Sequence, residues 1–190
     1  MPQVLKAEVR ERLVAAAEHV FYVKGFMDAR LSDIAAQAGV STSLVYSYFK
    51  NKEDLFAETV QILPLDFDEI GRQEEELDVG SPYERYAAIA DDYMKLLLKH
   101  HRAFVIVMDK SQGTAYANSK GEMVAAMQHH IARQLEKKSP KKYPDLLPHV
   151  LASNFVEGLL EAARHYQSPE QAHELLDLIM RCYYEGVNSL

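Results

Sequence analysis

The polar side chains between residues 42 and 52 are of the types that bind a DNA duplex. They comprise two small hydroxyls at the start of the segment, a third between two phenols, and two lysines at its end: Thr42, Ser43, Tyr46, Ser47, Tyr48, Lys50 and Lys52. Hydroxyl groups bond to base edges and phosphate oxygens in a major groove, and ammonium groups neutralise phosphates. The segment therefore predicts DNA recognition, with a helical hairpin that has no role at DNA as the alternative.

Two short predicted helices, residues 31–38 and 42–49, position these side chains. Gly39 permits the sharp turn between them, and the Ser41 hydroxyl caps the second helix. A longer amphipathic helix over residues 9–21 precedes them and ends at Lys24-Gly25, and Asn51 caps a fourth helix. This order predicts a helix-turn-helix whose two short helices share a small apolar core: Ile34, Ala35, Ala38, Val40, Val45 and Phe49.

The remainder of the chain also predicts helices, because apolar residues recur there at helical spacing. The expected helices are residues 83–100, 102–110, 120–137, 146–166 and 169–187, with interruptions at residues 64, 71–82, 111–119 and 139–148. No convincing period-two alternation calls for strands. The predicted fold class is all-α, with a helix-turn-helix DNA-binding domain at residues 1–52 and a larger helical ligand-binding and dimerisation domain at residues 53–190.

Charge is distributed unevenly along the 190 residues. Residues 1–52 hold seven Lys/Arg and five Asp/Glu, whereas residues 53–190 hold 14 and 23. Only the first segment is therefore expected to approach a polyanion. The single cysteine, Cys182, excludes a disulfide framework, and no stretch reads as a signal peptide or a membrane span. These features predict a cytoplasmic protein that does not enter the membrane.

Three stretches, residues 13–26, 33–41 and 44–56, resemble the DNA-binding domain of TetR-type transcriptional regulators. The resemblance implies an all-helical homodimer that reads a palindromic operator and releases it on binding a small, largely apolar inducer. It places base and phosphate contacts at Thr42, Ser43, Tyr46, Ser47, Tyr48 and Lys52.

One position departs from the pattern of that family. The family usually has Thr or Ser at the start of the second helix, where the hydroxyl both caps the helix and meets a phosphate, and this chain has Ala29-Arg30 there. Arg30 can hold the phosphate by its charge but cannot replace the cap. Asp28 and Ser32 are the two candidates for that task.

The last two helices carry apolar stripes, which predict either a dimer interface or ordinary monomer core. Similar TetR-type proteins build a four-helix bundle between subunits from these helices, and this resemblance favours the interface. The expected interface residues are Leu151, Phe155, Gly158, Leu159, Ala162, Leu176, Ile179, Tyr183 and Val187.

Flexible methionines and flat aromatic rings between residues 83 and 166 suit either an adaptable ligand cavity or a packed core. Three polar residues on the same helices could orient a ligand. The candidates for ligand binding are Tyr93, Met94, Phe104, Met108, Met127, His130, Asn154 and Glu157.

Motifs for metal binding and catalysis are missing from the sequence. The adjacent pairs His100-His101 and His129-His130 point about 100° apart on a helix, so neither pair faces one ion, and no HExxH spacing occurs. There is no GxSxG, no phosphate-binding glycine loop and no GxGxxG after a strand. We therefore expect no enzyme, no metal and no cofactor. A ligand-responsive DNA-binding repressor is the first hypothesis. The alternative is a helical scaffold that acts through a protein partner, or that binds DNA without small-molecule control.

Overall fold

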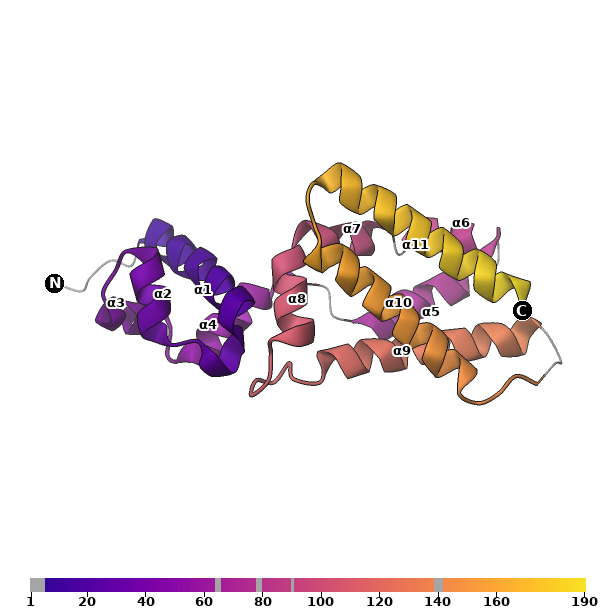
Figure 1. Ribbon diagram of the computed structural model, residues 1–190, viewed down its shortest axis with the longest axis horizontal. Helices are drawn as coiled ribbons and strands as arrows, with labels where there is room; N and C mark the ends of the chain where they lie inside the picture. The colour runs from indigo at the N-terminus through magenta and orange to yellow at the C-terminus, as the bar shows by residue number, and fades with distance from the viewer. Residues whose placement is uncertain (1–5, 64–65, 78–79, 90, 139–141) are drawn as a thin grey trace. The chain divides into compact units, whose positions relative to one another are not determined.

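The computed structural model describes residues 6–63, 66–77, 80–89, 91–138 and 142–190 (Figure 1). Its described residues form helices and loops without a strand, which confirms the predicted all-α class. None of the helices in this part of the chain combines the length and apolar character needed to cross a membrane. The chain divides into two compact units, residues 1–63 with 102–117 and residues 64–101 with 118–190.

The first unit contains α1 (Ala7–Asp28), α2 (Leu31–Ala38), α3 (Thr42–Tyr48), α4 (Lys52–Val60) and nearly all of α8 (His101–Asp109). Its core is an aromatic cluster in which the Phe56 ring lies 5.1 Å from that of Phe21 and 5.3 Å from that of Phe26. Leu13, Ile34 and Leu55 are fully buried. These apolar contacts fix the three helices that carry and support the turn before α3.

Two glycines set the path of the chain in this unit. Gly25 has φ +75° inside the span assigned to α1, so the straight part of that helix ends there, as the Lys24-Gly25 signal predicts. Gly39 has φ +66° at the end of α2, and its N–H donates to the Ala36 carbonyl. Only glycine takes this left-handed conformation without strain, so Gly39 provides the turn into α3.

The second unit contains α5 (Phe67–Glu76), α6 (Pro82–Ile89), α7 (Asp91–Lys99), α9 (Ser119–Lys138), α10 (Leu147–Arg164) and α11 (Pro169–Ser189). α10 packs against both α9 and α11 (Figure 1). Ile131, Leu135 and Ala152 are the buried centre of the contact between α9 and α10. α11 also contacts α6 and α7.

Helix α5 is a difference from the sequence prediction, which placed an interruption from residue 71 onward. The Asp66 carboxylate accepts the Glu69 N–H at 3.0 Å and so caps the helix, and Ile70 is buried. The sequence of α5 is amphipathic but polar on average and contains Gly71, a residue of low helix propensity, which favoured an interruption over a helix.

The division into units also differs from the predicted boundary after residue 52. Helix α4, which begins at Lys52, belongs to the first unit because Leu55 and Phe56 are buried in its core. The segment 102–117 joins the same unit: the Phe26 N–H donates to the Lys110 carbonyl at 2.9 Å, and Tyr116 packs on Phe56.

Candidate nucleic-acid interface

Helix α3 has one buried side and one exposed side. Val45 is fully buried and Phe49, just after the helix, is 3% exposed, so these two side chains anchor α3 on the first unit. The Ser41 hydroxyl accepts the Leu44 N–H at 3.3 Å, which confirms the predicted N-cap. The other side presents Ser43, Tyr46 and Ser47 to solvent, and Tyr46 is 59% exposed. The predicted contact residues at these three positions therefore share an accessible surface.

Two further residues of the predicted set are half-buried. Thr42 is in the first turn of α3, and Tyr48 is in the last. The Tyr48 hydroxyl accepts the backbone N–H of Lys6 at 3.0 Å, so it holds the chain just before α1 beside the end of α3. Tyr48 therefore positions a neighbouring segment, a contact between residues 42 apart in the chain that no local pattern predicts.

The two predicted phosphate-binding lysines have different surroundings. Lys50 is exposed, and its backbone N–H donates to the Asp54 carboxylate at 3.1 Å. The Lys52 ammonium donates to the carbonyls of Phe26 at 2.7 Å and Ala29 at 3.0 Å, and it lies 4.2 Å from the centre of the Phe26 ring. Lys52 thus binds carbonyls at the end of α1, a placement that differs from the predicted phosphate contact.

The start of α2 is stabilised by a carboxylate, although it has no hydroxyl cap. The Asp33 carboxylate accepts the Arg30 N–H at 3.2 Å and the Lys24 ammonium at 2.9 Å. The hydrogen bond from Lys24, which is the larger effect, and the one from the Arg30 N–H hold the pKa of Asp33 below its ordinary value. Asp33, three residues after Arg30, is thus the acidic half of a capping box; it satisfies the N–H of the N-cap residue, a different donor from the one that a hydroxyl cap would satisfy.

A residue that the sequence analysis did not single out, Arg10, supports the same surface. Its guanidinium lies 4.9 Å from the centre of the Phe49 ring and pairs with the Glu58 carboxylate at 2.9 Å. That pairing raises the pKa of Arg10. Arg10 links α1 to α4 and to the end of α3, whereas Arg30 and Lys50 remain exposed near the two ends of the helix-turn-helix.

The predicted dimer residues in the second unit fall into two groups. Leu159, Ala162 and Leu176 are buried within one chain, and so is Phe155. Phe155 and the remaining residues border an open apolar groove of about 610 Å³ between α10 and α11, where Leu178 is 50% exposed: Leu151, Phe155, Gly158, Ile179, Tyr183 and Val187. The groove leaves apolar side chains of both helices accessible, and Cys182 lies on it.

The eight predicted ligand residues are distributed over both units, and their role in ligand binding stays a prediction. Phe104 and Met108 are buried in the first unit, whereas Met94 and His130 are buried in the second. Tyr93 is half-buried on α7. Met127 is half-buried on α9, and its sulfur accepts a hydrogen bond from the Tyr183 hydroxyl at 3.4 Å. Asn154 is exposed and borders the groove between α10 and α11.

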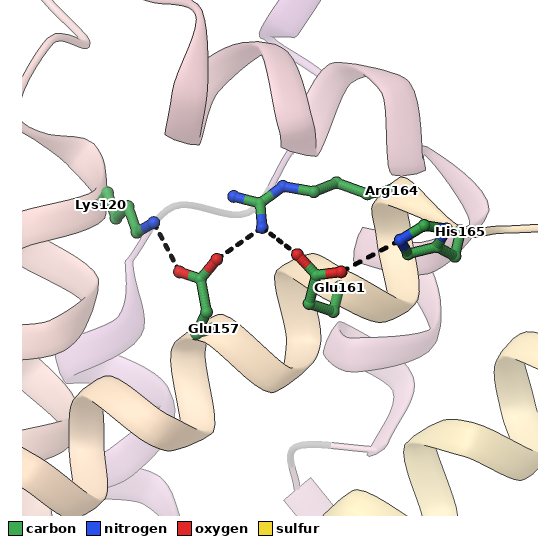
Figure 2. Close-up of polar contacts among 5 residues, drawn as sticks. All are labelled: Lys120, Glu157, Glu161, Arg164 and His165. Carbon is green, nitrogen blue, oxygen red and sulfur yellow. Dashed lines mark hydrogen bonds and ion pairs between the residues drawn. The ribbon is translucent and has the colours of Figure 1, made fainter.

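Glu157, the last of the eight, belongs to a network of charged groups on α9 and α10 (Figure 2). Its carboxylate pairs with the Lys120 ammonium at 2.7 Å and with the Arg164 guanidinium at 2.5 Å. Arg164 also pairs with Glu161, which reaches His165 at 3.1 Å. Lys120, and then Arg164, lower the pKa of Glu157. The contacts link the first turn of α9 to α10. Across the part of the chain that the structure describes, no three His, Cys, Asp or Glu residues are grouped so as to hold a metal.

Comparison with protein families gives a match over the helix-turn-helix. Residues 13–59, about a quarter of the chain, match the model for "Bacterial regulatory proteins, tetR family". The match spans α2 and α3 and includes most of α1 and α4, and it confirms the resemblance noted in the sequence.

Curated relatives match over the same end of the chain. An uncharacterized HTH-type transcriptional regulator, YdgC, from Bacillus subtilis is 45% identical over 53 residues, which cover 28% of this chain and 27% of the relative. The HTH-type transcriptional regulator TtgR from Pseudomonas putida is 35% identical over 75 residues, which cover 40% and 36%. The matched stretches thus span about a quarter to a third of these relatives.

Solved structures match over nearly the whole chain. A TetR-family transcriptional regulator from Bordetella parapertussis shares 18% identity at a TM-score of 0.65, covering 97% of this chain and 98% of that one. At this identity the likeness concerns the fold. The helical second unit is therefore an architecture found in solved regulators of this type.

Proposed function

Because its N-terminal domain is that of the tetR family of bacterial regulatory proteins, we propose that this chain is a DNA-binding transcriptional regulator that reads its operator with α3. The observation that carries the proposal is the two-sided character of α3. Val45 and Phe49 fix one side, while Ser43, Tyr46 and Ser47 are accessible on the other. A helix fixed in this way can enter a major groove without losing its anchors.

The roles in DNA binding follow from accessibility. Ser43, Tyr46 and Ser47 contact base edges and adjacent backbone, with Thr42 beside them at the start of the helix. The exposed charges of Arg30 and Lys50 neutralise phosphates on either side. Tyr48 contributes by holding Lys6, and Lys52 by stabilising the end of α1.

The proposed functional form is a homodimer on a palindromic operator. A single short recognition helix offers few contacts, and two copies double them at half-sites spaced by about 34–36 Å. The groove between α10 and α11 supports this, because a second copy would cover its accessible apolar side chains. Sedimentation at micromolar concentration should give twice the chain mass of 21.6 kDa. A mass of one chain would contradict the dimer.

The proposed regulation is repression relieved by a small, largely apolar inducer that binds the second unit. An inducer releases DNA only to the extent that it binds the released conformation more tightly than the DNA-bound one. The support for this step is the helical architecture shared with solved regulators and the apolar interior of the second unit.

Fluorescence anisotropy with labelled DNA tests the DNA-binding role directly. The upstream DNA of the gene and a random-site pool are titrated with protein at low salt. Tyr46→Ala should weaken binding to the selected site by about tenfold, since one good groove contact is worth about 1–3 kcal/mol. Val23→Ala is the matched control, because Val23 is 61% exposed on α1, outside the predicted contact surface. Failure of the wild-type protein to bind either DNA would refute the proposal and favour a scaffold that acts through a protein partner.

A further inference from the structure

A second pocket in the second unit lies between α7 and the beginning of α11. It has a volume of about 490 Å³, within the range of small-molecule sites. Its apolar surface comes from Leu98 on α7, from Ala172 and Leu176 on α11, and from Pro169 at the start of α11. None of the residues that the sequence predicted as ligand contacts borders it.

The charged groups on the rim of this pocket are basic, and Tyr166 adds a phenol. Lys95, Lys99 and His173 border it, and none of the described residues that line it is an aspartate or a glutamate; Asp91 is nearby only as the partner of Lys95. This contrasts with residues 53–190 as a whole, where 23 acidic residues outnumber 14 basic ones. Local positive charge beside an apolar surface complements an anion that has an apolar body.

The two lysines differ in what they offer to a ligand. The Lys95 ammonium pairs with the Asp91 carboxylate at 2.5 Å, and this hydrogen bond raises its pKa. Lys99 is exposed in the last turn of α7, one helical turn from Lys95. Lys99 is therefore placed to receive the anionic group, while Lys95 adds charge and remains bound to its own helix.

The wall opposite α7 is held in place by local contacts. The Tyr166 ring stacks on that of His101 with centroids 4.0 Å apart and planes 9° apart. The Ser168 hydroxyl caps α11 by accepting the Gln171 N–H at 3.2 Å. These contacts fix the turn that carries Tyr166 and Pro169, so the pocket is formed before a ligand arrives.

We propose that this pocket binds a small organic anion, with an apolar body against Leu98, Ala172 and Leu176 and one carboxylate at Lys99, and that this anion is the effector. The inference rests on the proposed regulatory function and names the site and class of its ligand. A neutral apolar molecule would leave the lysines unused, and a cation would be repelled by them.

Calorimetric titration with decanoate tests the site, with decanol and decylammonium as ligands of the same chain length. Decanoate should bind the wild-type protein about two- to fivefold more tightly than decanol, the range expected of one ion pair at an exposed site. Decylammonium should bind more weakly than either. Equal affinities for decanoate and decanol would overturn the proposal.

Two substitutions locate the binding. Lys99→Gln keeps most of the side-chain length and removes the charge, so it should lower decanoate affinity about two- to fivefold and leave decanol affinity unchanged. Lys137→Gln, at an exposed position on α9, is the matched control and should change neither. Ala172→Leu fills the apolar end and should weaken both ligands, with circular dichroism confirming the fold. Decanoate binding that is insensitive to Lys99→Gln would refute this site.

The effector role is separated from the DNA-binding role by one further measurement. Operator affinity of the same samples without decanoate tests the proposed function alone. Decanoate should then weaken operator binding by the wild-type protein. The Lys99→Gln variant should need a higher decanoate concentration for the same effect, in proportion to its lower affinity for decanoate. Normal operator binding that decanoate leaves unchanged would overturn the effector assignment while leaving the DNA-binding proposal intact.

Discussion

Lys52 provides the sharpest test of the structural reasoning, because the sequence and the structure give it different tasks. In the structure its ammonium donates to the Phe26 and Ala29 carbonyls and lies over the Phe26 ring. Lys52→Met keeps the aliphatic stem and removes these interactions. Hydrogen bonds that involve a charged group contribute about 1.5–3 kcal/mol and an exposed cation–π contact about 0.5–1 kcal/mol. Because Lys52 is only half-buried, we expect a net loss of about 2 kcal/mol.

That loss is large enough to measure by chemical and thermal unfolding. For a chain of this size about 1 kcal/mol shifts Tm by about 2–4 °C, so Lys52→Met should lower Tm by about 4–8 °C. The matched control is Lys50→Met, two residues away at an exposed position. It should leave Tm unchanged and reduce the slope of log affinity for DNA against log salt by about 1, as expected for one lost phosphate contact.

The opposite pattern would refute this reasoning. If Lys52→Met left the unfolding midpoint unchanged and reduced the salt slope as Lys50→Met does, Lys52 would be a phosphate ligand, as the sequence alone suggested. The assignment of its ammonium to the end of α1 would then be wrong. Binding is measured well below the melting temperature of the variant, so that loss of folded protein does not imitate loss of affinity.

Three further predictions use other contacts of the same structure. Lys24 and the Arg30 N–H lower the pKa of Asp33 in the folded state. The Asp33 carboxylate therefore stabilises the fold above its unfolded pKa of about 3.9, and this stabilisation is lost as pH falls through the lower folded value. Asp33→Asn should flatten the decline in stability at acid pH, and an unchanged decline would contradict the cap. Gly39→Ala should destabilise the protein by about 1 kcal/mol in urea unfolding because φ is +66° there, and a neutral result would contradict the left-handed turn. Cys182 lies on the groove between α10 and α11, so its rate of alkylation should fall as protein concentration rises through the dimerisation range, whereas a constant rate would place the interface elsewhere.

The sequence by itself determined the helix-turn-helix because its signals are local. The glycine at residue 39, the caps at Ser41 and Asn51, and the apolar spacing that buries Val45 all act within one or two helical turns. Periodicity and capping depend on neighbours close in the chain, so they can be read without coordinates. The accessible row of Ser43, Tyr46 and Ser47 follows from the same periodicity.

Only the tertiary structure decided which partners the charged groups take and where the cavities lie. Lys52 meets carbonyls 23 and 26 residues earlier in the chain, and Tyr48 meets a backbone N–H 42 residues earlier. Glu157 binds Lys120, and the pocket with Lys99 forms where α7 packs on α11. Such pairings depend on how helices distant in sequence pack together. Because a lysine suits a phosphate, an anionic ligand or a carbonyl equally well by residue type, packing is what selects among them.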